Sequence, residues 1–588
     1  MREVIRNPDD AYFVDTLSPY YIKTKDGQYL FASSQPGRRP DRAFYMVPEG
    51  YKLGYGQNSF PKDVGHVVYR VAMEYLEKTD VIVQDAIQGE DPYTTGIQIT
   101  TSIDCTQSAY IPWIGKHMVY PHDGKTKLSC FNYIIPEELP SEYVERIREV
   151  WPEYDPSVPL TLYDLTGIDK DIRKVLSLKV DYFGGAYKKP NLTLVWNRGE
   201  SDGLISYHGG CTQHRIIKGL SGTGKTTLSV GPELEQDDAL LGKIIYDDDT
   251  AQKIDIIGLE AASFAKSEGL GPGSPEWAGL MRAHESYVIA MNIDCENVYY
   301  TEIEEGPYTI KVPRVEEGKE AGSLLTNEYE RSGTRNGRFI FDFSALNSEW
   351  NTKKKTLKRE ALVFKRFNTM EPLFRVIDPR MAVALDSACE SIITSAVSGK
   401  KAGSKVRSYA ATDFMAREQS HQALLKWKVY EDLDLSLGGD LVFFIMNSGY
   451  MGRNDLAGNT RYDENGNPKG EKIRVGDTKL LLDLVDNNAI EEWVRTPLFG
   501  YLVPHPEEIE EKHGLEGYTT RFNLLNHYTA SELIDFARQD IEERTTFLRS
   551  LFAGQEGEDD LRPIIEYWNN ISLPDRKTIV KFYKRYYK

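Results

Sequence analysis

Apolar positions along the chain follow two periods, one that favours strands and one that favours helices. The runs VIVQDAI (81–87) and LTLVW (192–196) are short and apolar, so they predict strands. The run VGHVVYRVAMEYLEK (64–78) spaces its apolar residues three or four apart, so it predicts an amphipathic helix. This alternation predicts an N-terminal α/β domain over residues 1–195.

A second α/β region begins near residue 196. It combines a glycine-rich loop, an acidic cluster and the apolar run LVFFIMNSG (441–449), which predicts another strand. Amphipathic helical patterns follow in the tail, including SELIDFARQDIEERTTFLRSLF (531–552) with Ser531 as its expected N-cap. We therefore expect residues 196–588 to form a nucleotide-binding domain with a helical C-terminal region.

Length and charge narrow the class of function. A chain of 588 residues is too long for one ordinary core, so two or three domains are expected. The formal net charge of −18 disfavours sequence-independent binding to nucleic acid, because such binding needs clustered Lys and Arg against the phosphates. A small anionic substrate would therefore need a local basic pocket.

Cysteine usage and apolar runs bear on the cellular compartment. The five cysteines are scattered and lack CxxC spacing, so we expect neither a disulfide framework nor a zinc site. The N-terminal MREVIRNPDDAYF lacks the apolar core of a secretory signal. No window approaches the roughly 18 apolar residues of a membrane span. We expect a cytoplasmic protein without a membrane partner, and the oligomeric state stays open.

A glycine-rich loop carries the strongest local signal. Residues 219–226, GLSGTGKT, satisfy the pattern G-x-x-x-x-G-K-[ST] of a phosphate-binding loop, or P-loop. Apolar Ile216 and Ile217 precede the loop and the helix-compatible TTLSV follows it, which is the strand-loop-helix context that the motif requires. Its backbone N–H groups would cradle phosphate oxygens, Lys225 would reach the β and γ phosphates, and Thr226 would bind Mg²⁺.

An acidic cluster lies downstream of the P-loop. The apolar pair Ile244 and Ile245 leads through a tyrosine into Asp247, Asp248 and a third aspartate. A bare triphosphate would repel these carboxylates, so a divalent cation is expected between them, as at a Walker B acid. A solvated acidic turn after an edge strand is the alternative interpretation.

The string GLSGTGKTTLS closely resembles the phosphate loop of ATP-dependent phosphoenolpyruvate carboxykinases. Other segments resemble that family in the same order. They are GRRPDRAFYMV (37–47), VIVQDAIQGEDP (81–92), FGGAYKK (183–189), YHGG (207–210), GLEAASFAK (258–266), SGTRNGRFIF (332–341), NSGYMG (447–452) and KIRVGDTK (472–479). The resemblance implies an N-terminal α/β domain joined to a P-loop-containing mixed α/β nucleotide domain, with the active site in the cleft between them.

The resemblance also implies a reaction. In such enzymes oxaloacetate loses CO₂, and the enolate of pyruvate attacks the γ phosphate of ATP while two divalent ions neutralise charge. The implied cofactors are ATP, Mg²⁺ and Mn²⁺, and the implied partner is a small carboxylate substrate, expected to be oxaloacetate. Lys189, His208 and Asp248 match the ligands of the second metal, usually Mn²⁺, while Thr226 matches a ligand of the nucleotide Mg²⁺.

Further roles carry over from the same resemblance. Arg38 and Arg335 match the arginines that grip the substrate, because guanidinium forks suit planar carboxylates. Lys188 adds positive potential, Ser221 contacts substrate or phosphate, and Glu276 aligns with an acid near the nucleotide. The implied nucleotide-binding residues are Gly219, Leu220, Ser221, Gly222, Thr223, Gly224, Lys225, Thr226, Thr227, Glu276, Arg335, Lys472, Ile473 and Thr478.

Several positions depart from the family pattern. Phe183 replaces a tyrosine near the substrate carboxylate, Lys472 replaces an arginine that stacks on adenine, and the family's mobile lid is reduced to Ser398–Gly403. Three hypotheses therefore compete. They are a divergent ATP-dependent carboxykinase, a kinase on the same scaffold that phosphorylates another small acid, and a nucleotide sensor without turnover.

Overall fold

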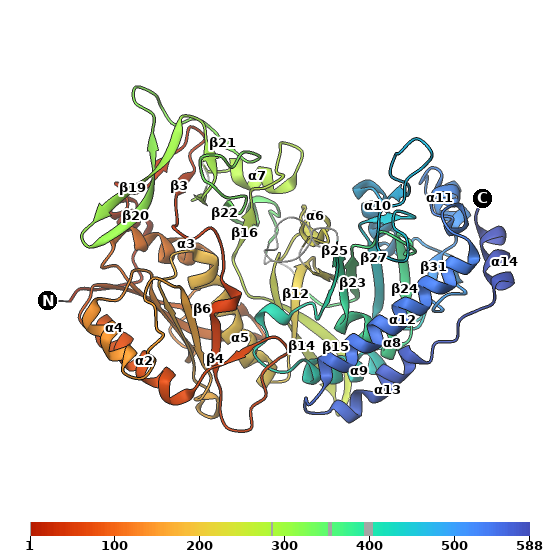
Figure 1. Cartoon of the computed structure of the whole chain (residues 1–588), viewed down its shortest axis with the longest axis horizontal. Helices are drawn as coiled ribbons and strands as arrows, with labels where there is room; N and C mark the ends of the chain where they lie inside the picture. Colours follow the sequence, from red (N-terminus) through yellow and green to blue (C-terminus); the bar gives the residue numbers. More distant parts are fainter. Residues whose placement is uncertain (1, 221, 284–285, 351–354, 393–403) are drawn as a thin grey trace.

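The computed structural model describes residues 2–220, 222–283, 286–350, 355–392 and 404–588 (Figure 1). Its architecture is mixed α/β with several sheets, as the apolar periods predict. Two lobes lie side by side in Figure 1, and the short helix that follows the P-loop lies between them. Within the described residues, no helix combines the length and the apolar character that a membrane crossing requires.

The N-terminal lobe is built on a nine-stranded sheet. Residues alternate between its two faces with a period of two, so Val81 and Val83 pack under α2 (Lys62–Leu76) and α4 (Ser141–Arg148). Ile82 points to the opposite core, which α5 (Lys189–Ser201) shares. The strand order is β1 (Val4–Arg6), β6 (Val81–Glu90), β7 (Tyr93–Ser102), β9 (Leu128–Ile135), β11 (Arg173–Leu178), β10 (Leu160–Asp164), β4 (Ala43–Met46) and β5 (Asn58–Ser59), with β8 (Tyr120–Pro121) on β6.

A second nine-stranded sheet forms the other lobe. Its strands β13, β23 and β27 are parallel, so their carboxyl ends meet at one edge of the sheet, where ligands of α/β proteins bind. The strand order is β15 (Thr250–Gly258), β14 (Ala239–Asp247), β12 (Ile205–Cys211), β13 (Arg215–Gly219), β23 (Arg359–Phe364), β27 (Val442–Asn447), β24 (Leu373–Val376), β31 (Leu502–Pro504) and β30 (Trp493–Arg495). Helices α8 (Pro379–Ser387), α9 (Gln419–Asp432), α12 (Ala530–Phe552) and α13 (Glu558–Asn569) pack against one another in this lobe.

A third sheet draws strands from both sides of residue 195. It runs β16 (Ala262–Lys266), β22 (Arg338–Asp342), β17 (Ile289–Met291), β3 (Tyr29–Phe31) and β2 (Ile22–Lys23), with β3 parallel to β17. Segments far apart in the sequence therefore share one sheet. The division of the chain at residue 195 stays a prediction.

Two local expectations differ from the structure. The run 192–196 lies inside helix α5, not in a strand, because this helix is buried on nearly every side and so lacks the polar face that marks an amphipathic helix. The N-cap of α12 is Thr529 rather than Ser531. Thr529 and Glu532 accept each other's backbone N–H in a capping box, which fixes the helix start two residues earlier.

Candidate active site

The P-loop has the strand-loop-helix geometry that its sequence predicts. Strand β13 ends at Gly219 and helix α6 (Lys225–Ser229) begins at Lys225. Gly222 and Gly224 have φ of 78° and 97°, a left-handed conformation that glycine adopts without a Cβ penalty. Lys225 Nζ donates to the Gly219 carbonyl at 2.7 Å, so the ammonium already lies over the loop. Ser221 lies outside the described residues.

Strand β12 brings His208 next to this loop. The antiparallel register pairs Gly209 with Lys218, so His208 lies opposite Gly219. Its Nδ1–H donates to the Ala410 carbonyl at 3.0 Å, which leaves the Nε2 lone pair facing Asp238 Oδ1 at 3.1 Å. Two acceptors at this distance need a proton or a cation between them.

Two consecutive lysines at the start of α5 lie beside the His208–Asp238 pair. A π-turn at Gly184–Lys188 precedes the helix, a feature that often marks functional sites. The buried Lys188 places Nζ 2.8 Å from Asp238 Oδ2 and 3.1 Å from Glu260 Oε2. Lys189 Nζ lies over the ring of Phe414, whose edge packs on His208 with 4.8 Å between ring centroids. Lys188, Lys189, His208 and Asp238 are therefore neighbours.

The charges of this cluster suit a divalent cation. Burial lowers the pKa of His208, and the Lys225 ammonium lowers it further, which favours the neutral form of the imidazole. Burial opposes ionisation of Asp238, but the Lys188 ammonium outweighs it and holds the pKa of Asp238 well below its usual range. A neutral imidazole beside an ionised carboxylate is the form in which both groups bind metal.

The fit to a metal rests on few protein donors. Within the described residues, no three His, Cys, Asp or Glu side chains converge as a metal site would require. The candidate set is His208 and Asp238 with Lys189 as a third donor. Thr226 is half-buried in the first turn of α6, on the P-loop side of this set. The facing Nε2 and Oδ1 atoms are the observation that favours a cation here.

The acid beside His208 is Asp238, not Asp248. Strand β14 pairs Ala239 with His208, and Asp248 lies nine residues further along, which is about 30 Å of extended strand. Asp248 lies in the exposed turn of the β14–β15 hairpin with φ of 51°, a conformation that aspartate tolerates in such turns. Asp247 is the exposed last residue of β14. The strand register therefore separates Asp247 and Asp248 from the His208 cluster, and the solvated-turn interpretation holds for them.

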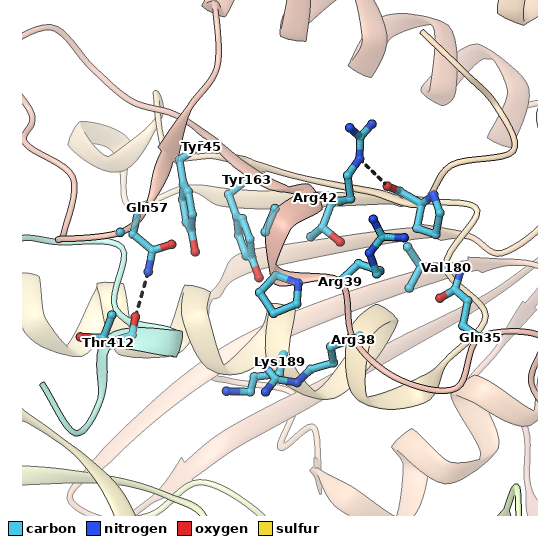
Figure 2. A pocket seen from close by; sticks show the side chains of 16 residues that line it. Gln35, Arg38, Arg39, Arg42, Tyr45, Gln57, Tyr163, Val180, Lys189 and Thr412 are labelled. Carbon is cyan, nitrogen blue, oxygen red and sulfur yellow. Dashed lines mark hydrogen bonds between the residues drawn. The ribbon is translucent and has the colours of Figure 1, made fainter. Parts of the chain in front are cut away.

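A cavity opens beside the cluster on the side of the N-terminal lobe (Figure 2). It holds about 790 Å³ of empty space, part of it open to solvent. Arg38 and Lys189 lie together in it, under Tyr45 and Tyr163, whose stacked rings are 4.5 Å apart. The predicted substrate arginine therefore shares a cavity with the predicted metal lysine.

Arg335 is placed differently from Arg38. Its side chain is 66% exposed, lies 3.9 Å from Glu268 and covers the ring of Tyr329. The next residue, Asn336, reaches the Arg38 loop instead, since its Nδ2 donates to the Pro36 carbonyl at 2.8 Å and to the Tyr182 hydroxyl at 3.3 Å. The structure does not bring Arg335 into the lining of the cavity.

Several of the predicted nucleotide residues lie around the P-loop edge of the second sheet. Lys472 Nζ donates to the Ser448 carbonyl at 3.4 Å, and Ser448 Oγ donates to the Thr223 carbonyl, so this exposed lysine adjoins the loop. Ile473 and Thr478 are buried, so their side chains support the segment from inside. Thr227 is exposed on α6, and Leu220 packs partly against the core. Glu276, in α7 (Pro275–Met281), is buried, which raises its pKa.

Several cluster residues were missed from the sequence. The sequence pattern used to look for a metal-binding acid was an apolar strand that ends in an acid. Asp238 does not fit this pattern, because it precedes its strand instead of following it. Phe414, Tyr45 and Tyr163 are aromatic residues of ordinary spacing, and only the tertiary fold shows their roles. The Asp-Asp pair at 237–238, eleven residues past Thr226, was the one available signal.

Comparison with known proteins gives one distant match. No model of a protein family matches the chain. The chain is 26% identical over 215 residues to a phosphoenolpyruvate carboxykinase (ATP) of Caldanaerobacter subterraneus subsp. tengcongensis. The match covers 35% of this chain and 38% of that protein's length. It supports a distant relationship. The activity of the whole protein is therefore a matter for proposal.

Proposed function

We propose that this chain is an ATP-dependent, phosphoenolpyruvate carboxykinase-like enzyme that decarboxylates oxaloacetate and phosphorylates the resulting enolate. One observation carries the proposal. His208 and Asp238 face each other opposite the first residue of the P-loop, and Lys189 joins this cluster to the Arg38 cavity. This arrangement would place phosphate, cation and carboxylate next to one another, as a phosphoryl transfer to a carboxylate-bearing acceptor requires.

Each side chain has a physical part in this proposal. Lys225 and the loop amides hold the β and γ phosphates, and Arg38 orients the substrate carboxylate. His208 Nε2, Asp238 and Lys189 would hold Mn²⁺, and Thr226 would hold the nucleotide Mg²⁺. When bound, such cations supply positive charge for developing oxyanions. Lys188, fixed between Asp238 and Glu260, keeps Asp238 ionised and in place.

A kinase acting on another small carboxylate is the second candidate. Phe183 is fully buried between Tyr187 and Phe264, so it does not take the substrate-facing place of a family tyrosine. The cavity also carries two further arginines beside Arg38. Both observations favour an acceptor other than oxaloacetate, while the convergence of P-loop and metal donors disfavours a sensor without turnover.

The deciding experiment is incubation of the purified protein with ATP, Mg²⁺, Mn²⁺ and oxaloacetate. Formation of phosphoenolpyruvate, ADP and CO₂ in equal amounts supports the carboxykinase. Lys225→Ala is the matched control, because it removes the charge that neutralises the transferred phosphate and should abolish the reaction while the fold is retained. ATP consumption with another carboxylate but not with oxaloacetate moves the assignment to the kinase. Oxaloacetate-dependent product in Lys225→Ala would remove the P-loop from the mechanism.

A further inference from the structure

The Arg38 cavity is more basic than a small diacid requires. Four cationic side chains line it, Arg38, Arg39, Arg42 and Lys189, and no acidic side chain lines it within the described residues. On a chain with a formal net charge of −18, this is the local basic pocket that an anionic ligand needs.

The cationic groups occupy two separate places. Figure 2 shows Arg38 and Lys189 together below Tyr45 and Tyr163, with Arg42 above them and to the right of the two tyrosines. The two tyrosines are nearly parallel, with an interplanar angle of 8°, and both are buried, so they form one rigid wall of the cavity. A ligand that contacts both places must be longer than the group that Arg38 alone would grip.

Arg42 and Arg39 differ in what already neutralises them. Arg39 makes a two-pronged ion pair with Asp41, at 2.9 and 2.6 Å, and both side chains are exposed. Arg42 is half-buried, and its Nε donates to the Pro159 carbonyl at 3.3 Å. The Arg42 charge helps to lower the pKa of Asp41 and of Asp155, but none of the ion pairs among the described residues includes Arg42. Arg42 therefore retains more capacity than Arg39 to bind an anionic group of a ligand.

The remaining polar lining favours hydroxyl groups. Gln57 Nε2 donates to the Thr412 and Met415 carbonyls, both at 2.8 Å, and Gln35 Nε2 donates to the Lys179 carbonyl. Because both N–H groups of the Gln57 amide are engaged with backbone, its amide oxygen is what this side chain can offer a ligand. Gln35 keeps one N–H group as well as its oxygen. Amide oxygens only accept, so they suit ligand hydroxyls.

We infer that this cavity binds a hydroxylated small molecule with an anionic group at each end, one held by Arg38 and the other by Arg42. The inference rests on the proposed function for the placing of Arg38 at the acceptor end, beside Lys189 and the P-loop cluster. It names the substrate class more closely than a small carboxylate. Arg42 is the residue that selects the second anionic group.

Calorimetric titration with two matched probes tests this inference. Gluconate and gluconate 6-phosphate share the carbon chain and every hydroxyl except the terminal one, which carries the phosphate in the second. Only the second therefore has an anion at both ends. We expect wild-type protein to bind gluconate 6-phosphate at least about tenfold more tightly, since a charged hydrogen bond contributes on this scale. Arg42→Gln should reduce the preference below about threefold, whereas Arg39→Gln, already paired with Asp41, should retain most of it.

Further variants keep the test decisive. Arg42→Lys keeps the charge and should retain part of the preference, so a loss in Arg42→Gln that Arg42→Lys does not rescue points to a folding defect, which thermal melting checks. Equal binding of the two probes to wild type, no binding of either, or a full preference in Arg42→Gln would overturn the inference. These titrations contain no nucleotide or oxaloacetate. Failure of phosphoenolpyruvate formation would therefore count against the carboxykinase and leave this inference standing.

Discussion

Strand β14 has an aspartate beside each end, and the two have opposite surroundings. Asp238 precedes the strand and contacts Lys188 and His208 at 2.8 and 3.1 Å. Asp248 follows the strand in an exposed hairpin turn. Both belong to runs of acids next to the same apolar segment, so their local sequence is alike. The difference teaches that neighbours from other strands, and not the adjoining apolar run, decide which acid can serve a site.

The largest expected effect separates these two aspartates directly. Asp238→Asn removes a charge from the group that faces His208, so we expect kcat of ATP-dependent turnover to fall at least about 100-fold. Asp248→Asn changes an exposed turn and should leave kcat within about twofold. Steady-state kinetics of both variants under one condition measure the contrast. Equal losses in the two variants would show that the hairpin turn also reaches the site.

His208 offers the next contrast, this time with a histidine at the opposite end of the β12–β13 hairpin. His208→Ala removes the Nε2 donor, so the Mn²⁺ concentration for half-maximal stimulation should rise at least about tenfold. His214 is the matched control, because its Nδ1 makes a similar bond to the Thr356 carbonyl at 3.1 Å but it is exposed, away from the P-loop. Mn²⁺ titrations monitored by activity give both values. An unchanged Mn²⁺ response in His208→Ala would remove His208 from the metal site.

The local architecture was largely predictable from the sequence, and the pairing of distant segments was not. The P-loop is set by short-range chemistry, since glycines, a preceding apolar strand and a following helix occur within a dozen residues. The helix at 192–196 was predicted as a strand, because full burial removes the polar face by which a surface helix is recognised. The pairing of β3 with β17 joins segments more than two hundred residues apart, which no local pattern encodes.

The site was predictable where a motif fixes a side chain and not where the register does. Lys188, Lys189 and His208 belong to segments that resemble a family, and the structure brings all three beside the P-loop. Asp238 depends on which residue of β14 pairs with His208, and a strand register cannot be obtained from one sequence. Arg335 resembles a substrate arginine, but its neighbour Asn336 is the residue that contacts the Arg38 loop.

Glu137 sharpens the comparison by showing a buried carboxyl without a lysine beside it. Burial raises the pKa of Glu137 to about 7, although Ser102 and Tyr75 donate hydrogen bonds to it. Its ordinary pKa is lower, so the unfolded chain releases this proton first, and stability is lost as pH rises from about 4.5 to about 7. Glu137→Gln cannot ionise. It should therefore be more stable than wild type at pH 8, by about 1 to 2 kcal/mol.

Urea unfolding at pH 5 and pH 8 measures the free energy of unfolding of Glu137→Gln and of wild type. The difference between the two proteins should grow with pH. Glu138→Gln is the matched control, since Glu138 is 46% exposed and pairs with Lys179 at the surface. Its difference from wild type should be small at both pH values. A gain for Glu137→Gln that is the same at both pH values would mean that ionisation of Glu137 is not the cause.

The smallest expected effect concerns Phe183, the position that the family resemblance marks as lacking a substrate hydroxyl. From the sequence, Phe183→Tyr would be expected to improve use of oxaloacetate. The structure packs the Phe183 ring against Tyr187 and Phe264, with centroid distances of 5.2 and 4.9 Å, and exposes none of it. We therefore expect kcat/KM for oxaloacetate to stay within about twofold, because the added hydroxyl enters an aromatic core rather than the cavity.

Tyr182→Phe is the informative comparison, since the Tyr182 hydroxyl accepts from Asn336 beside the Arg38 loop, and its loss should raise KM. A clear gain in Phe183→Tyr with no change in Tyr182→Phe would show that Phe183, and not Tyr182, faces the substrate.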